Sequence, residues 1–357
     1  MLILYITYVD INSGTSGSSV RPQKMYKAFL DEGHEVKLLT GSQNRTDWPC
    51  RRKAVREIMG WLDTNTPDLC YVESPVYPII LPEDYRLIRK VHRMGVPIGY
   101  FYRDCQRRFP ELFPRRSGLV GAVKEWYLDR MQRRTDNILR LVDIVYFPTK
   151  RVSKLFNYDD MRTLPPGGEN RLSFSVPEKN TCIYVGGIVK TYGGTLLLDA
   201  FEQLNRGEET YRLILVCREN EWAMLEHPSK NVPWLEVHHI SANELEPLYQ
   251  RAGVAMAVYN GGAYADLAIS VKLFEYLGHR LPIVVCGSKS MENMIEEGGF
   301  GRTAKCTPES IAEEVKCVLA HREAYAQKAE EALLRNGLWT HRAEQVVRDL
   351  SKKKKKK

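Results

Sequence analysis

The sequence contains no uncharged apolar run of the roughly 18 residues that a membrane-spanning helix needs. Its first residues, 1–7, lack the basic segment and the cleavage site of a secretory signal peptide. The eight cysteines include no Cys-x-x-Cys pair, and Cys182, Cys217 and Cys286 lie within apolar, strand-like stretches. We therefore expect a cytoplasmic protein with reduced, buried cysteines, which is neither secreted nor spans a membrane.

Several catalytic and binding motifs are also missing. The chain has neither the Gly-x-Ser-x-Gly motif of an esterase-type hydrolase nor the Walker lysine motif of an NTPase. It also lacks the Gly-x-Gly-x-x-Gly fingerprint of dinucleotide-binding proteins. His238 and His239 are adjacent, so their side chains would leave a strand on opposite faces, and no metal site is expected.

The net charge of the chain lies mostly in one segment. The formal net charge is +8, and the lysine run at 352–357 supplies six of these charges, which leaves +2 for the rest. This excess is too small for a general nucleic-acid surface, so nucleic acid is not an expected partner. We expect residues 352–357 to form a disordered tail. A length of 357 residues and an apolar fraction of 43% predict about two ordinary globular domains.

Strand-like and helix-like segments alternate along the chain in two blocks, which is typical of doubly wound α/β domains with parallel sheets. The segment Leu-Pro-Pro-Gly-Gly at 164–168 separates the blocks, because it joins a stiff dipeptide to a hinge. We predict domains at 1–165 and 166–337. The predicted strands are 2–8, 36–40, 69–73, 97–102, 144–148, 181–185, 211–217, 234–238, 253–259 and 283–286.

Residues 270–286 are the most informative stretch, a short helix that leads directly into a buried strand. Lys272 lies in the first helical turn, and Glu275 follows on the same face. Helix N-termini attract phosphate, because unpaired backbone N–H groups and the positive end of the helix dipole coincide there. A carboxylate can accept hydrogen bonds from two ribose hydroxyls. With the strand and glycine turn at 253–262, the pattern predicts a nucleotide site. An ordinary surface helix with one charged pair is the alternative.

In their order, the motifs of the chain resemble the GT-B glycosyltransferases, in particular the retaining group called family 4 or glycosyl transferases group 1. The resemblance covers essentially the whole chain apart from the tail. It implies an α/β protein of two Rossmann-like, doubly wound domains facing across a cleft, with the last helix, about 338–350, packing back on the first domain. The motifs are GHEV at 33–36, PPGGEN at 165–170, YVGGIVKTYGG at 184–194, ELEPLYQRAGVAMAVY at 244–259 and SVKLFEYLGHRLPIVV at 270–285.

The resemblance implies that the second domain binds a nucleotide-diphosphate sugar and the first domain the acceptor. Glu275 occupies the position of the family's ribose-binding glutamate. Lys190 is the basic phosphate ligand available in the glycine loop, and Lys272 or the helix start is the second support. Such enzymes need no metal or other cofactor, because cations and amides stabilise the departing diphosphate. The implied donor-binding set also includes Gly187, Ser270 and Val271.

The sequence departs from the family pattern near the reacting sugar. Leu267 stands where many relatives carry a glutamate, and we expect Asp266, the neighbouring carboxylate, to bind the donor instead. The strand at 97–102 ends where relatives often place a histidine that faces the sugar. We expect Arg103 or Asp104 to take the place of that histidine as the catalytic group.

The loop after the first strand, residues 13–17, is rich in glycine and serine. In a GT-B frame, Gly14 and Gly17 would contact the donor phosphates or the acceptor, and Arg21 could join them. A plain surface turn is the alternative.

Residues 103–140 contain ten Lys or Arg against five Asp or Glu, interleaved with aromatic and aliphatic residues. Such a pattern suits a helix that lies in an anionic membrane surface, on the inner face of the membrane if the protein is cytoplasmic. An amphipathic helix packed on its own domain is the alternative, and a structured RNA partner is a third.

We therefore expect a glycosyltransferase that moves a sugar from a nucleotide donor to a hydroxyl of a glycan or polyprenyl-linked acceptor, with retention, in cell-surface polysaccharide or glycoconjugate synthesis. A nucleotide-sugar 2-epimerase on the same fold is one alternative. A catalytically silent GT-B subunit that scaffolds a partner is the other.

Overall fold

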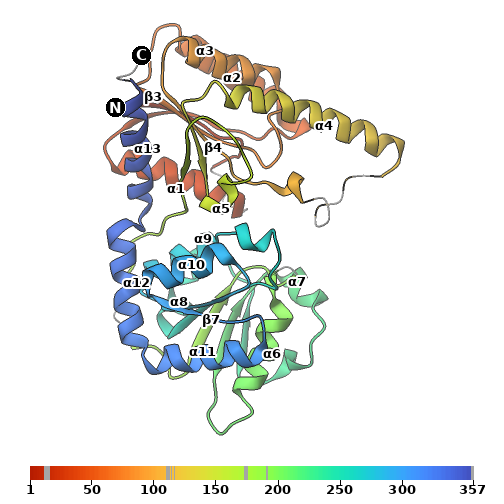
Figure 1. Ribbon diagram of the computed structural model, residues 1–357, viewed down its shortest axis with the longest axis vertical. Coiled ribbons are helices and arrows are strands. Elements are labelled where there is room, and N and C mark those ends of the chain that lie inside the picture. Colours follow the sequence, from red (N-terminus) through yellow and green to blue (C-terminus); the bar gives the residue numbers. More distant parts are fainter. Residues whose placement is uncertain are drawn as a thin grey trace. The chain divides into compact units, whose positions relative to one another are not determined.

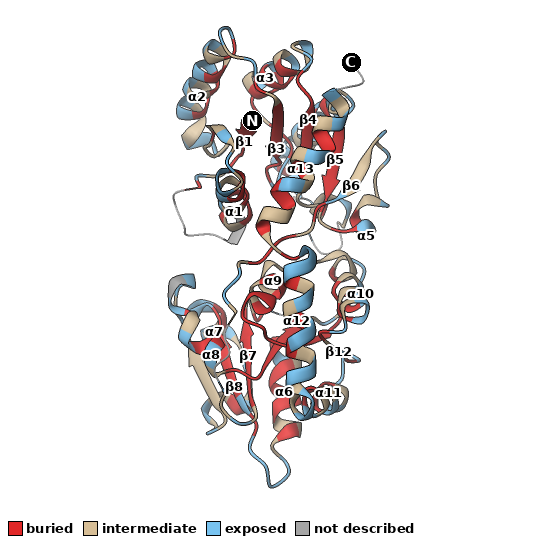
Figure 2. Ribbon diagram, turned by 90° about the vertical axis from the view of Figure 1, so that its left-hand side faces the viewer, coloured by how far each residue is buried: buried red, intermediate tan, exposed pale blue. Residues whose placement is uncertain are grey.

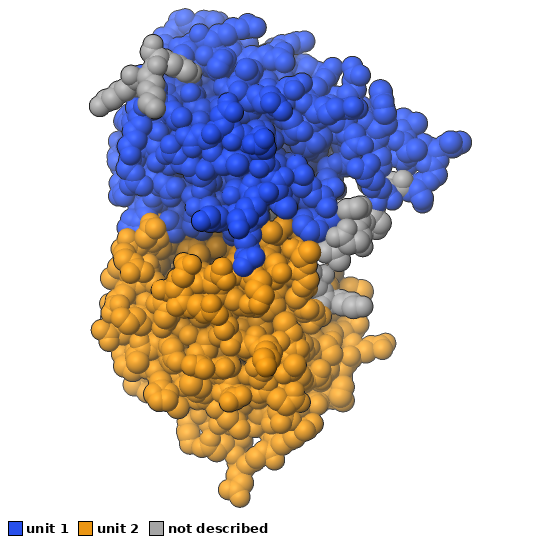
Figure 3. Space-filling view, in the orientation of Figure 1, with its two compact units in different colours: residues 1–165, 339–357 blue, residues 166–338 orange. Residues whose placement is uncertain are grey.

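Each half of the chain folds around its own six-stranded parallel sheet (Figure 1). The computed structural model describes residues 1–11, 17–109, 113, 115, 117–172, 176–189 and 192–354. The chain divides into unit 1, residues 1–165 with 339–357, and unit 2, residues 166–338 (Figure 3). The fold class expected from the sequence, two Rossmann-like domains with parallel sheets, is confirmed.

The sheet of unit 1 has the strand order β2-β1-β3-β4-β5-β6, with every neighbouring pair parallel. Strands β1, β3, β4 and β5 are almost entirely buried, because helices cover both faces of the sheet (Figure 2). The strands are β1 (Leu2–Ile6), β2 (Glu35–Leu39), β3 (Leu69–Glu73), β4 (Ile98–Phe101), β5 (Ile144–Phe147) and β6 (Met161–Thr163). The α-helices are α1 (Gly17–Asp31), α2 (Trp48–Trp61), α3 (Pro82–Arg93), α4 (Gly118–Leu139), α5 (Lys150–Ser153) and α13 (Trp339–Lys354).

The sheet of unit 2 has the order β12-β11-β10-β7-β8-β9, again parallel throughout. Its strands are β7 (Thr181–Val185), β8 (Arg212–Val216), β9 (Leu235–His238), β10 (Val254–Val258), β11 (Ile283–Cys286) and β12 (Gly301–Thr303). Its α-helices are α6 (Gly194–Leu204), α7 (Glu219–Met224), α8 (Glu246–Arg251), α9 (Val271–Gly278), α10 (Lys289–Gly298), α11 (Pro308–Ala320) and α12 (Arg322–Asn336). Two hydrophobic clusters, one on each face of the sheet, form its core.

The last helix, α13, packs against α1, β3 and β4 of unit 1. It continues to Lys354, three residues into the lysine run that the sequence predicts to be disordered. Lys353 lies 3.0 Å from Asp160, and Lys354 lies 2.8 Å from Asp68. The expectation of disorder from 352 is thus wrong for the first three lysines, which continue the helix, and acidic side chains of unit 1 compensate the charges of Lys353 and Lys354.

The edge strands β6 and β12 are not predicted from the sequence. Strands β6 and β12 have three residues each, too few to show the alternation that identifies a strand. Gly301 opens β12, and a Cβ atom there would lie 1.9 Å from the carbonyl oxygen of Ile283. The short strand therefore pairs with β11 only because glycine permits this close approach.

Among the described residues, no helix combines the length and the hydropathy that a membrane span requires.

Arg51 and Asp84 form a buried ion pair between α2 and α3. The Arg51 Nη2 and Asp84 Oδ1 atoms are 2.7 Å apart, and Arg51 Nη1 donates to the carbonyl oxygen of Thr7 at 2.6 Å. The two side chains are 0% and 1% exposed. Burial raises the pKa of Asp84 above its ordinary value, so this carboxylate depends on its partner to remain charged.

We predict that Arg51→Met destabilises unit 1 by about 3–5 kcal/mol, because it leaves the Asp84 charge buried without compensation. The measurement is urea-induced unfolding followed by circular dichroism. The matched control is Arg52→Met, since Arg52 pairs with Glu83 at 3.5 Å while 42% exposed. That control should lose no more than about 1 kcal/mol. Equal losses in the two variants would contradict the prediction.

Candidate functional site

The strand order of unit 2 reverses between β7 and β10. From β7 the chain builds β8 and β9 on one side, and then returns to build β10, β11 and β12 on the other. In parallel sheets, the loops at the carboxyl ends of two such strands diverge and leave a crevice that binds ligands. These loops are residues 186–193 and 259–270, which include the glycine motif and the approach to α9.

Helix α9 is fixed at this crevice by its buried face and by one tyrosine. Leu273, Phe274 and Leu277 are buried in the core of unit 2. The hydroxyl of Tyr276 accepts a hydrogen bond from the backbone N–H of Val185 at 3.0 Å, at the end of β7. The first turn of α9 is thereby held beside the end of the strand that carries the glycine loop.

Ser270 is the N-cap of α9. Its hydroxyl oxygen accepts a hydrogen bond from the backbone N–H of Lys272 at 3.1 Å. The Ser270 side chain therefore caps the helix, and Val271 is the first helical residue. Both lie where the sequence places the start of the helix, and their backbone N–H groups lie at the positive end of the helix dipole.

The structure brings Lys272 and Glu275 into direct contact. Lys272 Nζ donates to Glu275 Oε2 at 2.6 Å, and the Tyr249 hydroxyl donates to the same oxygen at 3.1 Å. Burial, with the Glu275 carboxylate nearby, raises the pKa of Tyr249 above its ordinary value, so its phenol remains a donor. Both bonds end on Oε2, and within the described part of the chain Oε1 takes no hydrogen bond.

Two hydrogen bonds, one from Tyr184 and one to Glu221, hold the glycine loop after β7. The Tyr184 hydroxyl donates to the carbonyl oxygen of Gly187 at 2.5 Å, and the Ile188 N–H donates to Glu221 Oε2 at 2.8 Å. A Cβ atom on Gly187 would lie 2.9 Å from the Tyr192 ring, so the close packing of this loop favours glycine. Lys190, predicted to bind phosphate, lies outside the described residues.

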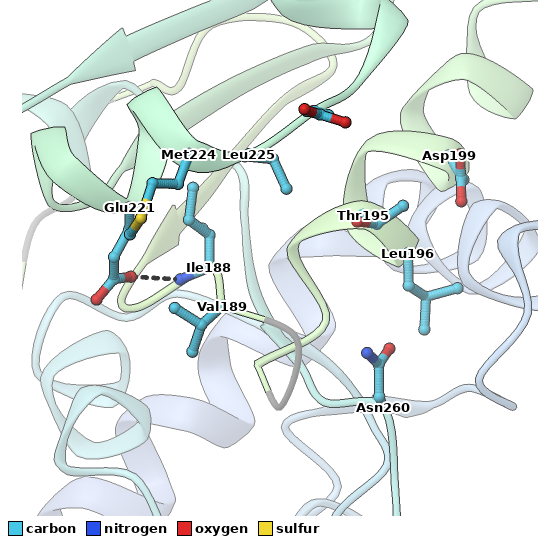
Figure 4. A pocket seen from close by; sticks show the side chains of 10 residues that line it. Ile188, Val189, Thr195, Leu196, Asp199, Glu221, Met224, Leu225 and Asn260 are labelled. Carbon is cyan, nitrogen blue, oxygen red and sulfur yellow. Dashed lines mark hydrogen bonds between the residues drawn. The ribbon is translucent and has the colours of Figure 1, made fainter.

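A pocket of about 690 Å³ opens beside this loop (Figure 4). Ile188 and Val189 from the loop, Thr195 and Leu196 from α6, and Asn260 from the loop after β10 line it. Glu221 of α7 also contributes, and Figure 4 shows its carboxylate directed at the Ile188 nitrogen. Sequence reasoning missed Glu221, because α7 is short and only the tertiary structure brings it under the loop. Lys272 and Glu275 do not line this pocket.

Asp266 has a structural task that the sequence did not show. Its Oδ1 atom accepts a hydrogen bond from the backbone N–H of Lys289 at 3.2 Å, and its carbonyl oxygen accepts from the Ser290 hydroxyl at 2.7 Å. Asp266 therefore caps the N-terminus of α10. Because its carboxylate is held at this helix, the expectation that Asp266 binds the donor gains no support from the geometry.

In unit 1, the strand order reverses between β1 and β3. Glu73, at the end of β3, is completely buried, and Arg21 of α1 pairs with its Oε1 atom at 3.1 Å. Arg103, which follows β4, lies 3.6 Å from Glu73 Oε2. The two terminal nitrogens of Arg103 are buried and make no hydrogen bond to the described residues. Arg342 of α13 lies near Arg21, and burial together with this neighbouring cation lowers the pKa of Arg342 to about 10.

The other predicted site residues of unit 1 are Gly14, Gly17 and Asp104. Gly14 lies outside the described residues, and Gly17 is the first residue of α1. Asp104 Oδ1 accepts a hydrogen bond from the backbone N–H of Gln106 at 3.1 Å. Asp104 also lines a second pocket, of about 180 Å³, with Arg107 and other polar and aromatic side chains. Arg103 and Asp104 thus face different surroundings.

Comparisons with known proteins agree with this geometry. Residues 179–321 match the family model described as glycosyl transferases group 1. This match covers β7 to α11 and so contains the loops of the crevice, α9 and the pocket. No curated protein sequence matches the chain.

Solved structures resemble the chain over nearly its whole length. A glycosyltransferase from Rickettsia africae ESF-5 is 11% identical with a TM-score of 0.65, and the match covers 100% of this chain and 99% of that one. HepE from Anabaena, solved in complex with UDP, is 11% identical with a TM-score of 0.66 over 99% and 100%. WaaG, a glycosyltransferase involved in lipopolysaccharide biosynthesis, is 13% identical with a TM-score of 0.61 over 98% and 99%. The chain thus has the GT-B fold, and residues 179–321 match the glycosyl transferases group 1 family.

Proposed function

We propose that this protein transfers a sugar from a nucleotide-diphosphate sugar to a hydroxyl of a glycan or polyprenyl-linked acceptor, with retention of anomeric configuration. We place this reaction in the synthesis of cell-surface polysaccharide or glycoconjugate. The observation that carries the proposal is the crevice of unit 2, where a glycine loop, a capped helix N-terminus and a Lys–Glu pair meet at the switch point of a group 1 domain. Its support includes HepE, a similar fold solved with UDP.

In this proposal, the diphosphate binds at the start of α9 and the ribose binds at Glu275. The N–H groups of the first turn and the Lys272 ammonium stabilise the phosphate charge, both in the bound donor and as the diphosphate departs. The Lys272 and Glu275 side chains are 27% and 29% exposed. A pair this exposed contributes about 1 kcal/mol or less, so a nucleotide can separate it at low cost. We propose that no metal is needed, because these groups already supply positive charge.

Arg103 is the residue we assign to the reacting end of the acceptor. Its guanidinium has donors without hydrogen-bond partners among the described residues, and it lies at the carboxyl edge of the sheet of unit 1. Arginine donors are suited to oxyanions, and a buried donor without a partner carries a free-energy cost that a ligand oxygen would remove.

One observation favours a second candidate, the silent scaffold. Asp266 caps α10 and Leu267 replaces the glutamate of relatives, so neither of these two positions supplies a carboxylate to the pair at Glu275. Turnover distinguishes the candidates. A transferase consumes the donor with an acceptor present, a 2-epimerase converts it without one, and a scaffold does neither.

We predict that UDP, GDP, ADP or dTDP raises the thermal unfolding midpoint of the protein, because a ligand that binds only the native state stabilises it. Glu275→Gln and Lys272→Met should each weaken binding of the stabilising nucleotide by about tenfold, which corresponds to ~1.4 kcal/mol for a hydrogen bond to a charged group. The measurement is isothermal titration calorimetry with that nucleotide.

The matched controls for this experiment are Glu331→Gln and Lys328→Met. Lys328 and Glu331 form a pair with the same spacing on α12, at 2.7 Å, and are about half exposed. Because this pair lies outside the crevice loops and α9, its loss should leave nucleotide affinity unchanged. If all four variants bound the nucleotide as tightly as the unaltered protein, the assignment of the donor site to α9 would be wrong.

We predict that loss of Arg21 lowers the stability of the protein, whereas loss of Arg103 lowers the rate of sugar transfer. Arg21 holds Glu73 and donates to the Pro165 carbonyl oxygen at 3.2 Å, so Arg21→Met should destabilise the protein by about 3–5 kcal/mol. Arg103→Met leaves Glu73 paired with Arg21 and should cost about 1 kcal/mol or less. This loss is small because the substitution removes buried donors that make no hydrogen bond to the described residues. It should lower the transfer rate by about 100-fold with nucleotide affinity retained. Normal turnover in Arg103→Met, checked with urea unfolding, would remove Arg103 from the reaction.

We also propose that the N-terminal half of α4 binds an anionic membrane on its cytoplasmic face. This helix extends outward from unit 1 (Figure 1), and its apolar side chains there are unusually exposed. Leu119 is 89% exposed, Val123 67% and Trp126 58%. Their spacing places them on one helix face with Arg130. This exposure distinguishes α4 from an amphipathic helix that packs its apolar face on its own domain.

The charges of α4 favour an anionic surface. All three acidic residues of α4 already have partners. Arg107 lies 3.2 Å from Glu125 and 2.5 Å from Asp129, and Asp136 accepts hydrogen bonds from Gln132 and Tyr158. Four cationic residues of α4 are exposed in the same stretch and towards its C-terminal end, namely Lys124, Arg130, Arg133 and Arg134. A helix with aromatic and aliphatic residues beside such cations inserts into the headgroup region of anionic bilayers.

We predict that the protein sediments with phosphatidylglycerol vesicles and far less with phosphatidylcholine vesicles. The double substitution Leu119→Ser with Trp126→Ser should reduce the bound fraction by about tenfold, because it removes roughly half of the exposed apolar contact. The control is Leu334→Ser on α12, since Leu334 is 44% exposed but isolated. Equal binding of the double variant and the unaltered protein would show that α4 is not the attachment site.

A further inference from the structure

Two cysteine thiols lie together at the carboxyl edge of the sheet of unit 2. Cys286 is the last residue of β11, and Cys306 lies in the turn between β12 and α11. Their sulfur atoms are 3.8 Å and 3.5 Å from the same acceptor, the carbonyl oxygen of Tyr259. Because both sulfur atoms contact this one oxygen atom, the two thiols are neighbours.

The two thiols have opposite surroundings. Cys286 is completely buried, whereas Cys306 is exposed. The neighbouring Cys286 thiol, with help from the Lys289 cation, lowers the pKa of Cys306 to about 7. The interaction with Cys306 and burial raise the pKa of Cys286 above its ordinary value. At neutral pH, an accessible thiolate thus lies near a protected thiol.

We propose that Cys286 and Cys306 are an oxidation site, a dithiol that closes to a disulfide by exchange with a small-molecule disulfide. The Cys306 thiolate attacks one sulfur of the reagent, whose S–S bond breaks, and the released thiolate takes up a proton. Cys286 then loses its proton to solvent and attacks Cys306, which releases the second half of the reagent as a thiol. Two protein thiols are oxidised and one disulfide is reduced to two thiols.

The roles of the two cysteines follow from their positions. An exposed thiolate reacts first with a reagent in solution, and a buried neighbour resolves the mixed disulfide once it has formed. Cys50 offers a contrast, because it is exposed on α2 and the structure shows no second thiol beside it among the described residues.

Closure of this disulfide would act on the edge of the pocket beside the glycine loop, which adjoins the proposed donor site. It removes the S–H groups that now contact the Tyr259 carbonyl oxygen, and Asn260, the next residue, lines the pocket. A Cβ atom on Gly261 would lie 3.9 Å from Cys306 Sγ, so the turn after β10 packs against the pair. This consequence depends on the proposed function, whereas the disulfide itself does not.

The experiment treats the full chain with oxidised glutathione and maps its peptides by mass spectrometry. The expected result is a cross-linked peptide pair that joins 286 to 306, has lost two hydrogen atoms and disappears with dithiothreitol. Cys50→Ser should give the same cross-link, and Cys306→Ser should give none. In Cys286→Ala, glutathione should remain attached to Cys306. A native protein in which glutathione stays on Cys306 without cross-linking would overturn the proposal, and this outcome needs no variant.

The pH dependence of alkylation supplies a second test. The rate of iodoacetamide reaction at Cys306 should rise with pH, reach half of its maximum near pH 7 and level off above, as the thiolate fraction does. At pH 7, an ordinary thiol of pKa ~8.5 is only about 3% thiolate, so Cys306 should react roughly threefold faster after allowance for its lower nucleophilicity. Cys286→Ala should shift the midpoint to higher pH. An unchanged midpoint would contradict the proposed pairing.

Calorimetry with UDP on the reduced and oxidised protein separates this inference from the proposed function. We expect oxidation to weaken UDP binding by at least threefold, and dithiothreitol to restore it. Equal affinity in both states would overturn the coupling to the pocket. A cross-link that forms in a protein to which no nucleotide binds would instead contradict the proposed function and leave the oxidation site standing.

Discussion

The hydrogen bond between the Val185 N–H and the Tyr276 hydroxyl joins the elements on which the candidate donor site depends. Val185 ends β7, and Tyr276 lies in the second turn of α9, whose buried face packs on the sheet. The Tyr276 hydroxyl is also 3.5 Å from the carbonyl oxygen of Met256 in β10. One phenol therefore spans the two strands between which the sheet reverses its order, and it holds the start of α9 beside the glycine loop.

Compensation of charge organises the rest of the molecule. Arg51 satisfies Asp84, and Arg21 satisfies Glu73, because a buried carboxylate without a partner would cost several kcal/mol. Lys272 and Glu275 compensate each other near the surface, where separating them costs little. The fold thus keeps rigid pairs in its interior and a separable pair at its crevice. Arg103 differs from all of these, since its buried nitrogens lack hydrogen bonds to the described residues.

Much of the fold could be predicted from the sequence. Strands at 69–73, 181–185 and 283–286 have the predicted bounds, because a buried parallel strand is a continuous apolar run. The local Ser-x-x-Glu pattern of Ser241 and Glu244 forms a capping box in the structure. Edge strands β6 and β12 could not be predicted, since pairing with a neighbour defines them rather than their own composition.

In the candidate site too, some features follow from local sequence and others only from the tertiary structure. Local sequence determined that Ser270 begins a helix, that Lys272 and Glu275 share a face, and that residues 186–194 form a glycine loop, because capping, helical period and backbone freedom act over a few residues. Only the tertiary structure decided that Asp266 caps α10, that Glu221 holds the glycine loop, and that Cys286 and Cys306 meet at one carbonyl oxygen. These contacts join elements distant in the chain, and it is the packing of strands and helices, rather than any local preference, that sets their distances.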